Sequence, residues 1–278
     1  MNIENPPKTF SEISARYPES GTGTLLGQCI DASRPLLYLS EELAQGSLRT
    51  PHEHPRGQLA WAASGVLRVN TEAGSWVVPP SHAVWITGGT RHEILVASRA
   101  AIRYLFVDPS VLDRLPDHCQ VMAVTPLFRE LLLRLLSYDL QQAQTGAQQR
   151  LVQVLLDELA ALQPSPLYLP SGQDRRLLVV MEQLSRNPAD TRTLPELAAV
   201  AGASPRTLER LFQSETGLGF QQWRSRLRLL EAVQRLNRGE GSAAVAHSLG
   251  YTSPSAFVAA FRRYFGQPPQ SFGASELA

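Results

Sequence analysis

The sequence has very few cysteines and no long apolar run. Cys29 and Cys119 are its only cysteines, and no C-x-x-C spacing occurs, so neither a disulfide framework nor a cysteine zinc site is indicated. This scarcity predicts a reducing compartment, the cytoplasm. The N-terminal MNIENPPKTF has no apolar stretch, and Arg134 interrupts the leucine-rich run 131–136. The sequence therefore predicts neither a signal peptide nor a transmembrane span, and no membrane partner.

Net charge is also nearly absent. The formal charge is +1 over 278 residues, which taken alone argues against a nucleic-acid partner. The two parts of the chain differ, however. Residues 174–278 contain 13 arginines against 9 acidic residues, a net charge of +4, whereas residues 1–173 contain 13 basic and 16 acidic residues, a net charge of −3. This asymmetry predicts one domain that binds a polyanion and another with a different task.

The first part of the chain has strand patterns and then helix patterns. Short β-rich segments occupy residues 36–107 and alternate with glycine and proline turns, as in an all-β sandwich or barrel. Leucines at i, i+3, i+4 spacing then predict amphipathic helices at 125–138 and 148–162. The apolar stripes of these helices either pack on their own barrel or pair in part with a second subunit, which would make the protein a homodimer.

The segment 163–173, QPSPLYLPSGQ, separates the two parts. Its three prolines and one glycine break both periodicities and predict an inter-domain linker. Only helical patterns follow, as far as residue 272. We therefore predict a two-domain α+β protein. Residues 1–162 form a sensing and dimerisation domain, a β-barrel with flanking helices, and residues 174–278 form an all-α domain.

The all-α part contains an internal repeat. Residues 194–217 and 242–266 each have an apolar helix, a glycine turn, a Ser-Pro pair and a second apolar helix. The glycine suits the left-handed end of the first helix, and the serine can cap the second. The glycines are Gly202 and Gly250, and the serines are Ser204 and Ser253. Each repeat predicts a helix-turn-helix, whose second helix can enter the major groove of DNA.

Helical-wheel positions, at about 100° per residue, assign the outward faces of these second helices. The predicted DNA-contacting residues are Arg206, Thr207, Arg210 and Gln213 in the first repeat and Ser255, Ala256, Ala259 and Arg262 in the second. Arginine can form two hydrogen bonds with guanine, whereas small residues suit thymine methyl groups. We expect the first repeat to read more of the DNA sequence.

Residues 220–236 predict one long helix between the two repeats. Such a helix would place the two second helices in consecutive major grooves, which lie about 34 Å apart. One chain could then read an asymmetric site of roughly two helical turns. Arg224 and Arg226 on this helix either contact phosphates or are solvated charges.

These segments resemble the AraC/XylS family of bacterial transcription regulators. The resemblance covers residues 174–273 and rests on LERLFQSETG at 208–217, WRSRLRLLEAVQRL at 223–236 and VAHSLGYTSPSAFVAAFRRYFGQPP at 245–269. It implies promoter or operator DNA and RNA polymerase as partners, activation of transcription, and base-reading positions at Arg206 and Arg210. Many relatives have larger polar residues where this chain has small ones in the second repeat, so we expect weak selectivity there.

The acidic part of the chain has five of the six histidines. His52 and His54 lie on one face of an extended segment, with Gln58 at the same parity, and His92 follows in a later strand. This pattern is similar to the two cupin motifs, with Gln58 in place of the usual glutamate, and implies a cupin-like barrel. Three imidazoles and an amide oxygen can hold a divalent transition metal, the only cofactor that the sequence suggests. The alternative is a polar interior that binds a small-molecule effector or hydrogen-bonds to itself.

Other aromatic and histidine residues have simpler interpretations. Trp85 and Tyr104 are candidates to line the effector site, and packing in the core is the alternative for each. Trp61 has the opposite parity to Gln58 and is expected to face the flanking helices. The remaining histidines are interpreted as surface residues at His82 and His118, and as a packing or phosphate-contacting residue at His247.

Three functions fit these patterns. The first is a transcription regulator in which a ligand bound in the barrel shifts the population of DNA-binding states. The segment WVVPPSHAVWI at 76–86 also resembles a subgroup of AraC-type sensors often linked to transporter genes. The second is a metal-dependent cupin enzyme of the dioxygenase type with an accessory DNA-binding domain. The third is an architectural DNA binder with an inert barrel. The sequence favours the first, and no enzyme activity, because the enzyme hypothesis leaves the repeat unexplained.

Overall fold

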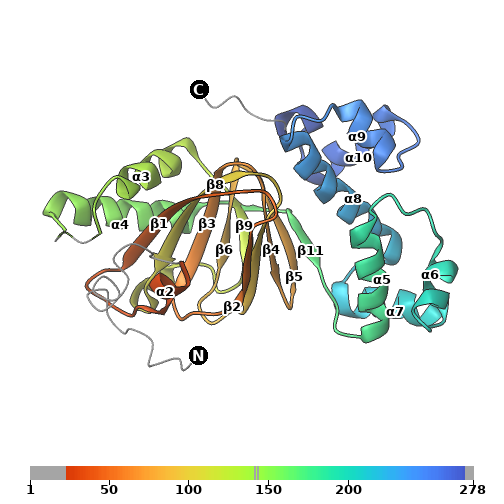
Figure 1. Cartoon of the computed structure of the whole chain (residues 1–278), viewed down its shortest axis with the longest axis horizontal. Coiled ribbons are helices and arrows are strands. Elements are labelled where there is room, and N and C mark those ends of the chain that lie inside the picture. Colours follow the sequence, from red (N-terminus) through yellow and green to blue (C-terminus); the bar gives the residue numbers. More distant parts are fainter. Residues whose placement is uncertain (1–22, 141, 143, 273–278) are drawn as a thin grey trace. The chain divides into compact units, whose positions relative to one another are not determined.

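Figure 1 shows the computed structural model, which describes residues 23–140, 142 and 144–272. The predictions drawn from residues 1–22, including the lack of a signal peptide, lie outside these residues. The chain divides into two compact units. One comprises Met1–Val69 and Pro80–Ser165, and the other comprises Asn70–Pro79 and Pro166–Ala278. The domain limits expected from the sequence, at 162 and 174, stay a prediction.

The described strands form two sheets. The six-stranded sheet has the order β1-β8-β3-β6-β9-β10, and the five-stranded sheet has the order β11-β5-β4-β7-β2. The bounds are β1 (Leu36–Leu43), β2 (Leu48–His52), β3 (Gly57–Ser64), β4 (Leu67–Thr71), β5 (Gly74–Val78), β6 (His82–Ile86), β7 (His92–Val96), β8 (Ala100–Val107), β9 (Gln120–Ala123), β10 (Pro164–Ser165) and β11 (Tyr168–Pro170). A short helix, α2 (Gly23–Gln28), precedes β1, and a 3-10 helix, η1 (Pro109–Arg114), follows β8. The sheet-rich N-terminal part confirms the predicted fold class.

Two helices cover one face of the six-stranded sheet, as Figure 1 shows. They are α3 (Pro126–Leu136) and α4 (Gly146–Ala161), close to the helices predicted from the leucine spacing. Phe128 and Leu155 are fully buried with Trp61 from β3 in one core. The apolar stripes thus pack on the sheet, and Trp61 faces the helices as predicted. No helix within residues 23–140 and 144–272 combines the length and apolar character needed to cross a membrane.

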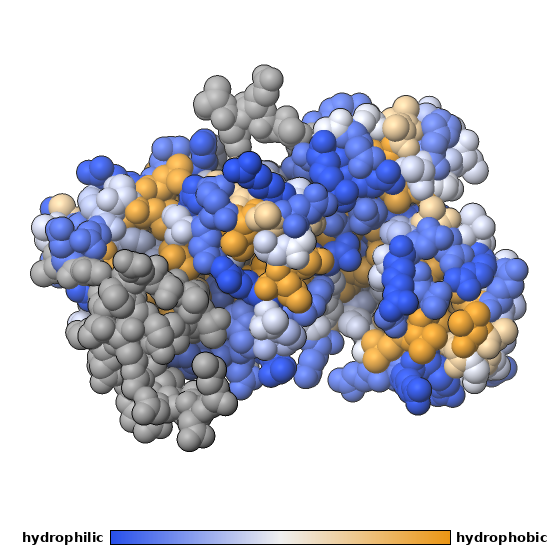
Figure 2. All heavy atoms as spheres, viewed as in Figure 1, coloured by the Kyte–Doolittle hydropathy of each residue, from blue (hydrophilic) through white to orange (hydrophobic). Residues whose placement is uncertain are grey.

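Apolar surface elsewhere is limited. In Figure 2 the orange apolar areas are broken up by blue hydrophilic ones. The large apolar side chains most exposed in the described residues come from separate elements: Ile30, Leu48, Leu127, Val154, Leu178 and Val200. Leu127 lies on α3 and Val154 on α4. These helices therefore retain some apolar surface beyond the part that packs on the sheet.

The segment 163–173, predicted as a linker, contains two short strands. β10 pairs with β9, and β11 pairs with β5, both antiparallel. The sequence predicts no strand here, because the prolines break the periodicity and have no N–H to donate to a neighbouring strand. Both strands are sheet edges, where proline is tolerated because one side of the strand needs no partner.

The C-terminal part is helical as predicted. Its helices are α5 (Arg175–Arg186), α6 (Leu194–Val200), α7 (Pro205–Thr216), α8 (Phe220–Asn237), α9 (Ser242–Ser248) and α10 (Pro254–Phe265), followed by the 3-10 helix η2 (Pro269–Phe272). Ser204 Oγ accepts from the Thr207 backbone N–H at the start of α7, and Ser253 Oγ accepts from that of Ala256 at the start of α10, each at 3.1 Å. Gly202 has a φ of 64° at the end of α6. The predicted repeat therefore forms two helix-turn-helix units, α6–α7 and α9–α10.

Aromatic residues fix α8 between these units. The Phe212 ring of α7 lies 5.7 Å from that of Trp223 on α8, and Trp223 Nε1 donates to the Pro170 carbonyl of β11 at 2.8 Å. The second unit buries Phe257, Phe261 and Phe265 on the inner side of α10. At 18 residues, α8 is about 27 Å long. It is the single long helix that the sequence predicts between the two repeats.

Candidate functional site

The outer face of α7 is polar and exposed. Leu208, Leu211 and Phe212 are buried, whereas Arg206, Arg210 and Gln213 are exposed. Within the described part of the chain, neither Arg206 nor Arg210 has a hydrogen-bond or ion-pair partner. Both guanidinium groups are therefore available to an external acceptor. Thr207 is only half exposed, and its hydroxyl lies 2.8 Å from Ser204 Oγ, so it also serves the cap.

The outer face of α10 is less polar. Phe257 and Phe261 are buried, and the residues predicted to face DNA are all exposed: Ser255, Ala256, Ala259 and Arg262. Small side chains permit a close approach of the helix backbone to DNA but supply few hydrogen bonds. The two repeats thus have the same geometry and different chemistry.

The arginines of α8 separate into two kinds. Arg224 donates to the Arg192 carbonyl at 2.8 Å and to Gln221 Oε1 at 2.9 Å, and burial lowers its pKa. Its guanidinium therefore supports the loop before α6 and is less available for phosphate than the sequence suggested. Arg226 makes no hydrogen bond or ion pair with the described residues and stacks over the Tyr264 ring at 5.1 Å. It lines a pocket of about 420 Å³ between α8 and α10.

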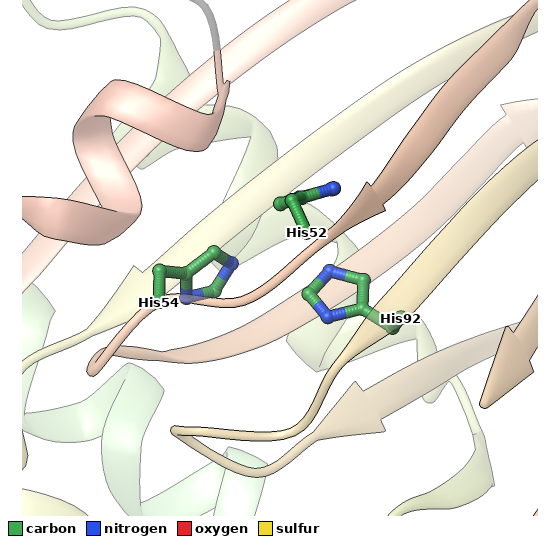
Figure 3. A group of neighbouring side chains, drawn as sticks. All are labelled: His52, His54 and His92. Carbon is green, nitrogen blue, oxygen red and sulfur yellow. The ribbon is translucent and has the colours of Figure 1, made fainter. Parts of the chain in front are cut away.

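Three histidines come together in the sheet-rich part (Figure 3). In the antiparallel pairing of β2 with β7, His52 is the register partner of His92, so both side chains project from the same face. His54 follows two residues after His52 and keeps the same parity. The ring centroids lie 4.4 Å (His52 to His92), 5.3 Å (His54 to His92) and 5.8 Å (His52 to His54) apart. One ring nitrogen of each histidine lies within 4.8 Å of the other two.

Backbone carbonyls fix the orientation of all three rings. The Nδ1 atoms of His52, His54 and His92 lie 2.8 Å from the carbonyl oxygens of Thr50, Arg56 and Thr90, respectively. Burial lowers the pKa of His54 and lowers that of His92 to about 4, so these two rings are neutral at pH 7. A neutral imidazole has a single N–H. With that N–H on Nδ1, the lone pair of each ring lies on Nε2.

Gln58 joins this cluster through His54. Its Oε1 lies 2.8 Å from His54 Nε2, and both residues are buried. When the single ring N–H is on Nδ1, Nε2 can accept from Gln58 only after the amide turns to present its N–H. The structure therefore brings together His52, His54, His92 and Gln58, the four residues predicted to form one site.

Tyr104 and Trp85 lie on opposite faces of the six-stranded sheet. Tyr104 stacks on Phe106 with ring centroids 6.1 Å apart, and Phe106 contacts the edge of His54 at 5.5 Å. Trp85 is the register partner of Leu59 and lies in the core beneath α3 and α4. Its Nε1 donates to the Pro116 carbonyl at 2.9 Å. Trp85 therefore packs in the core on the face away from the histidines, which is the alternative that the sequence left open for it.

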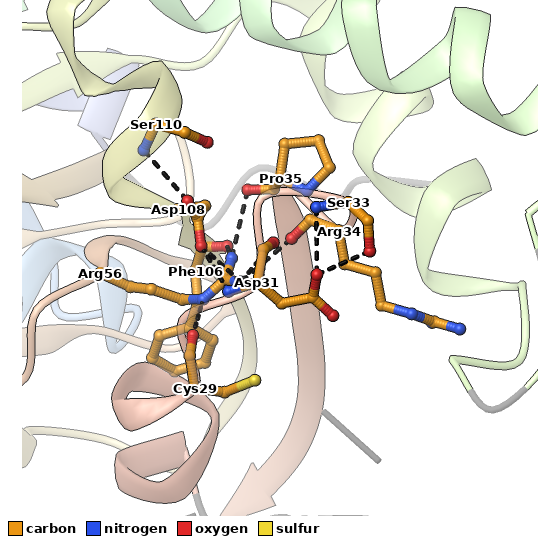
Figure 4. Close-up of polar contacts among 9 residues, drawn as sticks. All are labelled: Cys29, Asp31, Ser33, Arg34, Pro35, Arg56, Phe106, Asp108 and Ser110. Carbon is orange, nitrogen blue, oxygen red and sulfur yellow. Dashed lines mark hydrogen bonds and ion pairs between the residues drawn. The ribbon is translucent and has the colours of Figure 1, made fainter. Parts of the chain in front are cut away.

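A buried ion pair supports the loop behind His54 (Figure 4). Arg56 is 0% exposed, and its Nη2 lies 3.0 Å from Asp108 Oδ2. The same guanidinium donates to the backbone carbonyls of Cys29, Asp31, Arg34, Pro35 and Phe106. Asp108 accepts from the backbone N–H groups of Asp31 and Ser110. This network ties the segment before β1 to the loop that bears His54.

Comparison with known proteins assigns the two parts. The model described as "AraC-like ligand binding domain" matches residues 34–164, and the model "Helix-turn-helix domain" matches residues 197–275. The chain is 38% identical over 218 residues to the HTH-type transcriptional regulator NimR of Escherichia coli (strain K12), covering 78% of this chain and 80% of NimR. The chain is an AraC-family transcriptional regulator. It thus has a ligand-binding N-terminal domain and a DNA-binding C-terminal domain.

Other similarities of this AraC-family regulator are more distant. It is 34% identical over 114 residues to the regulator RipA of Corynebacterium glutamicum, covering 41% of this chain and 34% of RipA. ToxT from Vibrio cholerae aligns at 10% identity with a TM-score of 0.37, covering 86% of this chain and 98% of ToxT. The DNA-binding domain of AdpA, solved with a target DNA, aligns at 31% identity and a TM-score of 0.34, covering 36% of this chain and 90% of that domain.

Three polar residues in the sensor part of the AraC-family regulator were not identified from the sequence pattern. Glu41 on β1 and Arg49 on β2 form an ion pair at 2.6 Å, and their charges act on the hydroxyl of Tyr104. His82 was interpreted as a surface residue, and this was wrong because it is only 6% exposed. All five residues of β6 are buried, so neither of its faces meets solvent. Apolar residues occupy both odd and even positions after His82, and this pattern could have indicated that both faces of the strand are buried.

Burial of His82 predicts a loss of stability in acid. Burial lowers its pKa from 6.5 to about 4. As the pH falls below 6.5, His82 becomes protonated in the unfolded chain but stays neutral in the folded chain. The contribution of neutral His82 to the unfolding free energy is therefore fully present above pH 6.5 and is lost as the pH falls toward 4. We expect His82 to contribute about 2 kcal/mol to the fall in unfolding free energy between pH 7.5 and 5. Urea unfolding at both pH values should show a fall smaller by this amount in His82→Gln. The same fall in His118→Gln and His82→Gln would contradict this assignment.

Proposed function

We propose that this regulator reads one asymmetric DNA site with α7 and α10 in consecutive major grooves. The observation that supports this most directly is the exposure of the Arg206 and Arg210 guanidinium groups, which have no partner among the described residues, on a helix whose opposite face is buried. Arginine donates two hydrogen bonds to guanine O6 and N7. Thr207 and Gln213 flank them, and Ser255, Ala256, Ala259 and Arg262 complete the reading surface on α10.

Phosphate contacts would come mainly from Arg226, which has no hydrogen-bond or ion-pair partner in the described residues and stacks on Tyr264. Arg224 contributes less, because two of its donor nitrogens already meet protein oxygens. Phosphate contacts position the protein on the duplex and do not read its sequence. Loss of Arg226 is therefore expected to weaken binding to all sequences alike.

The effector would bind between the sensor strands, where buried polar atoms lack partners. Within the described residues, His92 Nε2, Tyr104 Oη and Glu41 Oε2 are buried and have no hydrogen-bond partner. Such atoms are rare in native proteins and each one calls for a partner. A small polar molecule or a metal ion would supply it. To control transcription, this ligand must bind the DNA-binding state of the protein with a different affinity from the other state.

The wider role follows from this proposal. We propose a homodimer in the cytoplasm that activates transcription with RNA polymerase and controls a neighbouring gene, with a transporter as the first candidate. Leu127 and Val154, exposed on α3 and α4, are the first residues to test for dimer contact. We also propose that the protein is not an enzyme, since its relatives are transcriptional regulators.

The test of this function is the selectivity of DNA binding. Fragments from upstream of the protein's own gene and of its neighbours are compared in gel shifts with unrelated fragments of equal length. We expect at least one upstream fragment to bind at least about 10³-fold more tightly than the unrelated ones at physiological salt. Equal binding to all fragments would contradict a sequence-reading regulator and leave the architectural alternative.

A further inference from the structure

We propose that the sensor holds one divalent transition metal ion on the Nε2 atoms of His52, His54 and His92, with Gln58 as the neighbouring oxygen donor. This inference rests on the proposed function, because it names the chemical class of ligand that the sensor binds.

The three rings have the spacing of a metal site. A tetrahedral ion with metal–nitrogen bonds of about 2.0–2.1 Å places imidazole centroids about 5.3 Å apart. The observed separations are 4.4, 5.3 and 5.8 Å. The ring nitrogens, within 4.8 Å of one another, need to approach to about 3.4 Å in such a site. The half-buried side chain of His52 has the most room to make this adjustment, which requires a shift of its hydrogen bond with the Thr50 carbonyl.

The hydrogen bonds of the rings have the pattern that metal ligands use. A histidine that binds a metal through one nitrogen usually donates its other N–H to a carbonyl or carboxylate, which fixes the ring. Each of the three Nδ1 atoms lies 2.8 Å from a backbone carbonyl. These carbonyls belong to residues two positions before or after the histidine in the chain. All three rings are thus held through Nδ1, which leaves Nε2 as the nitrogen for a metal ion.

The buried Nε2 atom of His92 is the observation that most directly indicates a ligand site. His92 is 2% exposed, and its Nε2 is buried without a hydrogen-bond partner in the described residues. Leaving a buried acceptor unpaired is unfavourable, because it has lost its hydrogen bonds to water. His92 Nδ1 is already held by Thr90, so the ring cannot relieve this by turning over without breaking that bond. A metal ion on Nε2 satisfies the acceptor.

The donor set selects the kind of metal. Neutral imidazoles suit zinc, nickel, copper, cobalt and iron, whereas magnesium and calcium require mostly oxygen ligands. Among the described residues, the group of metal-binding side chains contains only these three histidines and no carboxylate. Gln58 Oε1, which lies 2.8 Å from His54 Nε2, offers a neutral oxygen. The ion therefore keeps its positive charge, and its affinity is expected to rise if an anionic oxygen replaces that amide.

The experiment titrates zinc and cobalt(II) into the full-length protein after removal of metal with a chelator. Calorimetry with zinc and the visible absorption of cobalt both report the site. We expect one equivalent per chain and a visible band typical of a four- or five-coordinate cobalt site. His92→Gln and His52→Gln should each weaken binding at least about 10-fold, whereas His118→Gln, at an exposed histidine, should leave it unchanged. His52 is half-buried, so His52→Gln keeps the test valid even if His92→Gln fails to fold.

Gln58→Glu gives a test of opposite sign. A carboxylate beside the ion should tighten zinc binding at least about 10-fold, since it neutralises part of the charge. Less than about 0.1 equivalent bound to the wild type, or equal affinity in His52→Gln and His118→Gln, would overturn the metal site. An unchanged affinity in Gln58→Glu would remove Gln58 from it. Gel shifts on the same samples separate the two claims. Selective DNA binding without metal binding would overturn the metal site and leave the proposed function standing. Equal binding to all DNA fragments in every sample would overturn the proposed function.

Discussion

Arg210→Ala is expected to weaken binding to the specific DNA site by about 1–3 kcal/mol, which is roughly 5- to 150-fold. The guanidinium is exposed on α7 and has no partner in the described part of the chain, so its loss removes contacts to DNA without breaking contacts within the protein. A bidentate contact to guanine predicts that the loss falls at one base pair. Binding of the variant to a set of operators with single-base changes should therefore show relaxed preference at that position only.

Arg186→Ala is the control matched in charge. Arg186 is exposed on α5 and pairs with Glu182 at the surface, so its removal changes the net charge equally but leaves α7 intact. We expect its effect on specific binding to be small and independent of the DNA sequence. If Arg210→Ala instead weakens binding to every sequence equally and lowers the salt dependence, Arg210 contacts phosphate and does not read a base.

Arg56→Ala is expected to lower the free energy of unfolding by about 3–5 kcal/mol, because it leaves the buried charge of Asp108 without its partner. Burial alone would raise the pKa of Asp108. Hydrogen bonds from Ser110 and Asp31, together with the charge of Arg56, outweigh this effect and hold the pKa below its ordinary value. The carbonyls that the guanidinium binds would also lose their donor. Urea and thermal unfolding of the full chain measure this loss.

Arg114→Ala is the matched control for this prediction. It breaks another arginine–aspartate pair, with Asp157, but both side chains are at least half exposed, and such pairs contribute about 0–1 kcal/mol. If Arg56→Ala does not fold, Asp108→Asn removes the charge at nearly constant size and should destabilise in the same direction. Equal effects of Arg56→Ala and Arg114→Ala would show that the buried network does not support the fold.

The helical domain was largely predictable because its signals are local. Caps, left-handed glycines and apolar spacing act within one or two turns of helix. Ser204 and Ser253 cap α7 and α10 as expected. The burial of Leu208 and Phe212 then determines that Arg206 and Arg210 are exposed. The engagement of Arg224 with Arg192 could not be predicted, because it joins two segments that the sequence does not relate.

The sensor was less predictable because strand pairing is not local. The parity of His52, His54 and Gln58 predicts that they share a face, and that parity cannot be transferred to another strand without the register. Trp85 illustrates this, since its pairing with Leu59 places it beneath the helices. The meeting of His92 with His52 depends on the pairing of β2 with β7. The sequence suggested that meeting only through a motif similar to that of cupins.

Hydroxyl-radical footprinting of the wild-type protein on its highest-affinity promoter fragment tests the central claim most directly. If α7 and α10 enter consecutive major grooves, the protected positions should form two groups about one helical turn apart on one face of the duplex. Arg210→Ala should weaken protection in the α7 group at a protein concentration that still saturates the wild type. A single protected group, or protection spread evenly along the fragment, would contradict the claim that the two repeats read one site together.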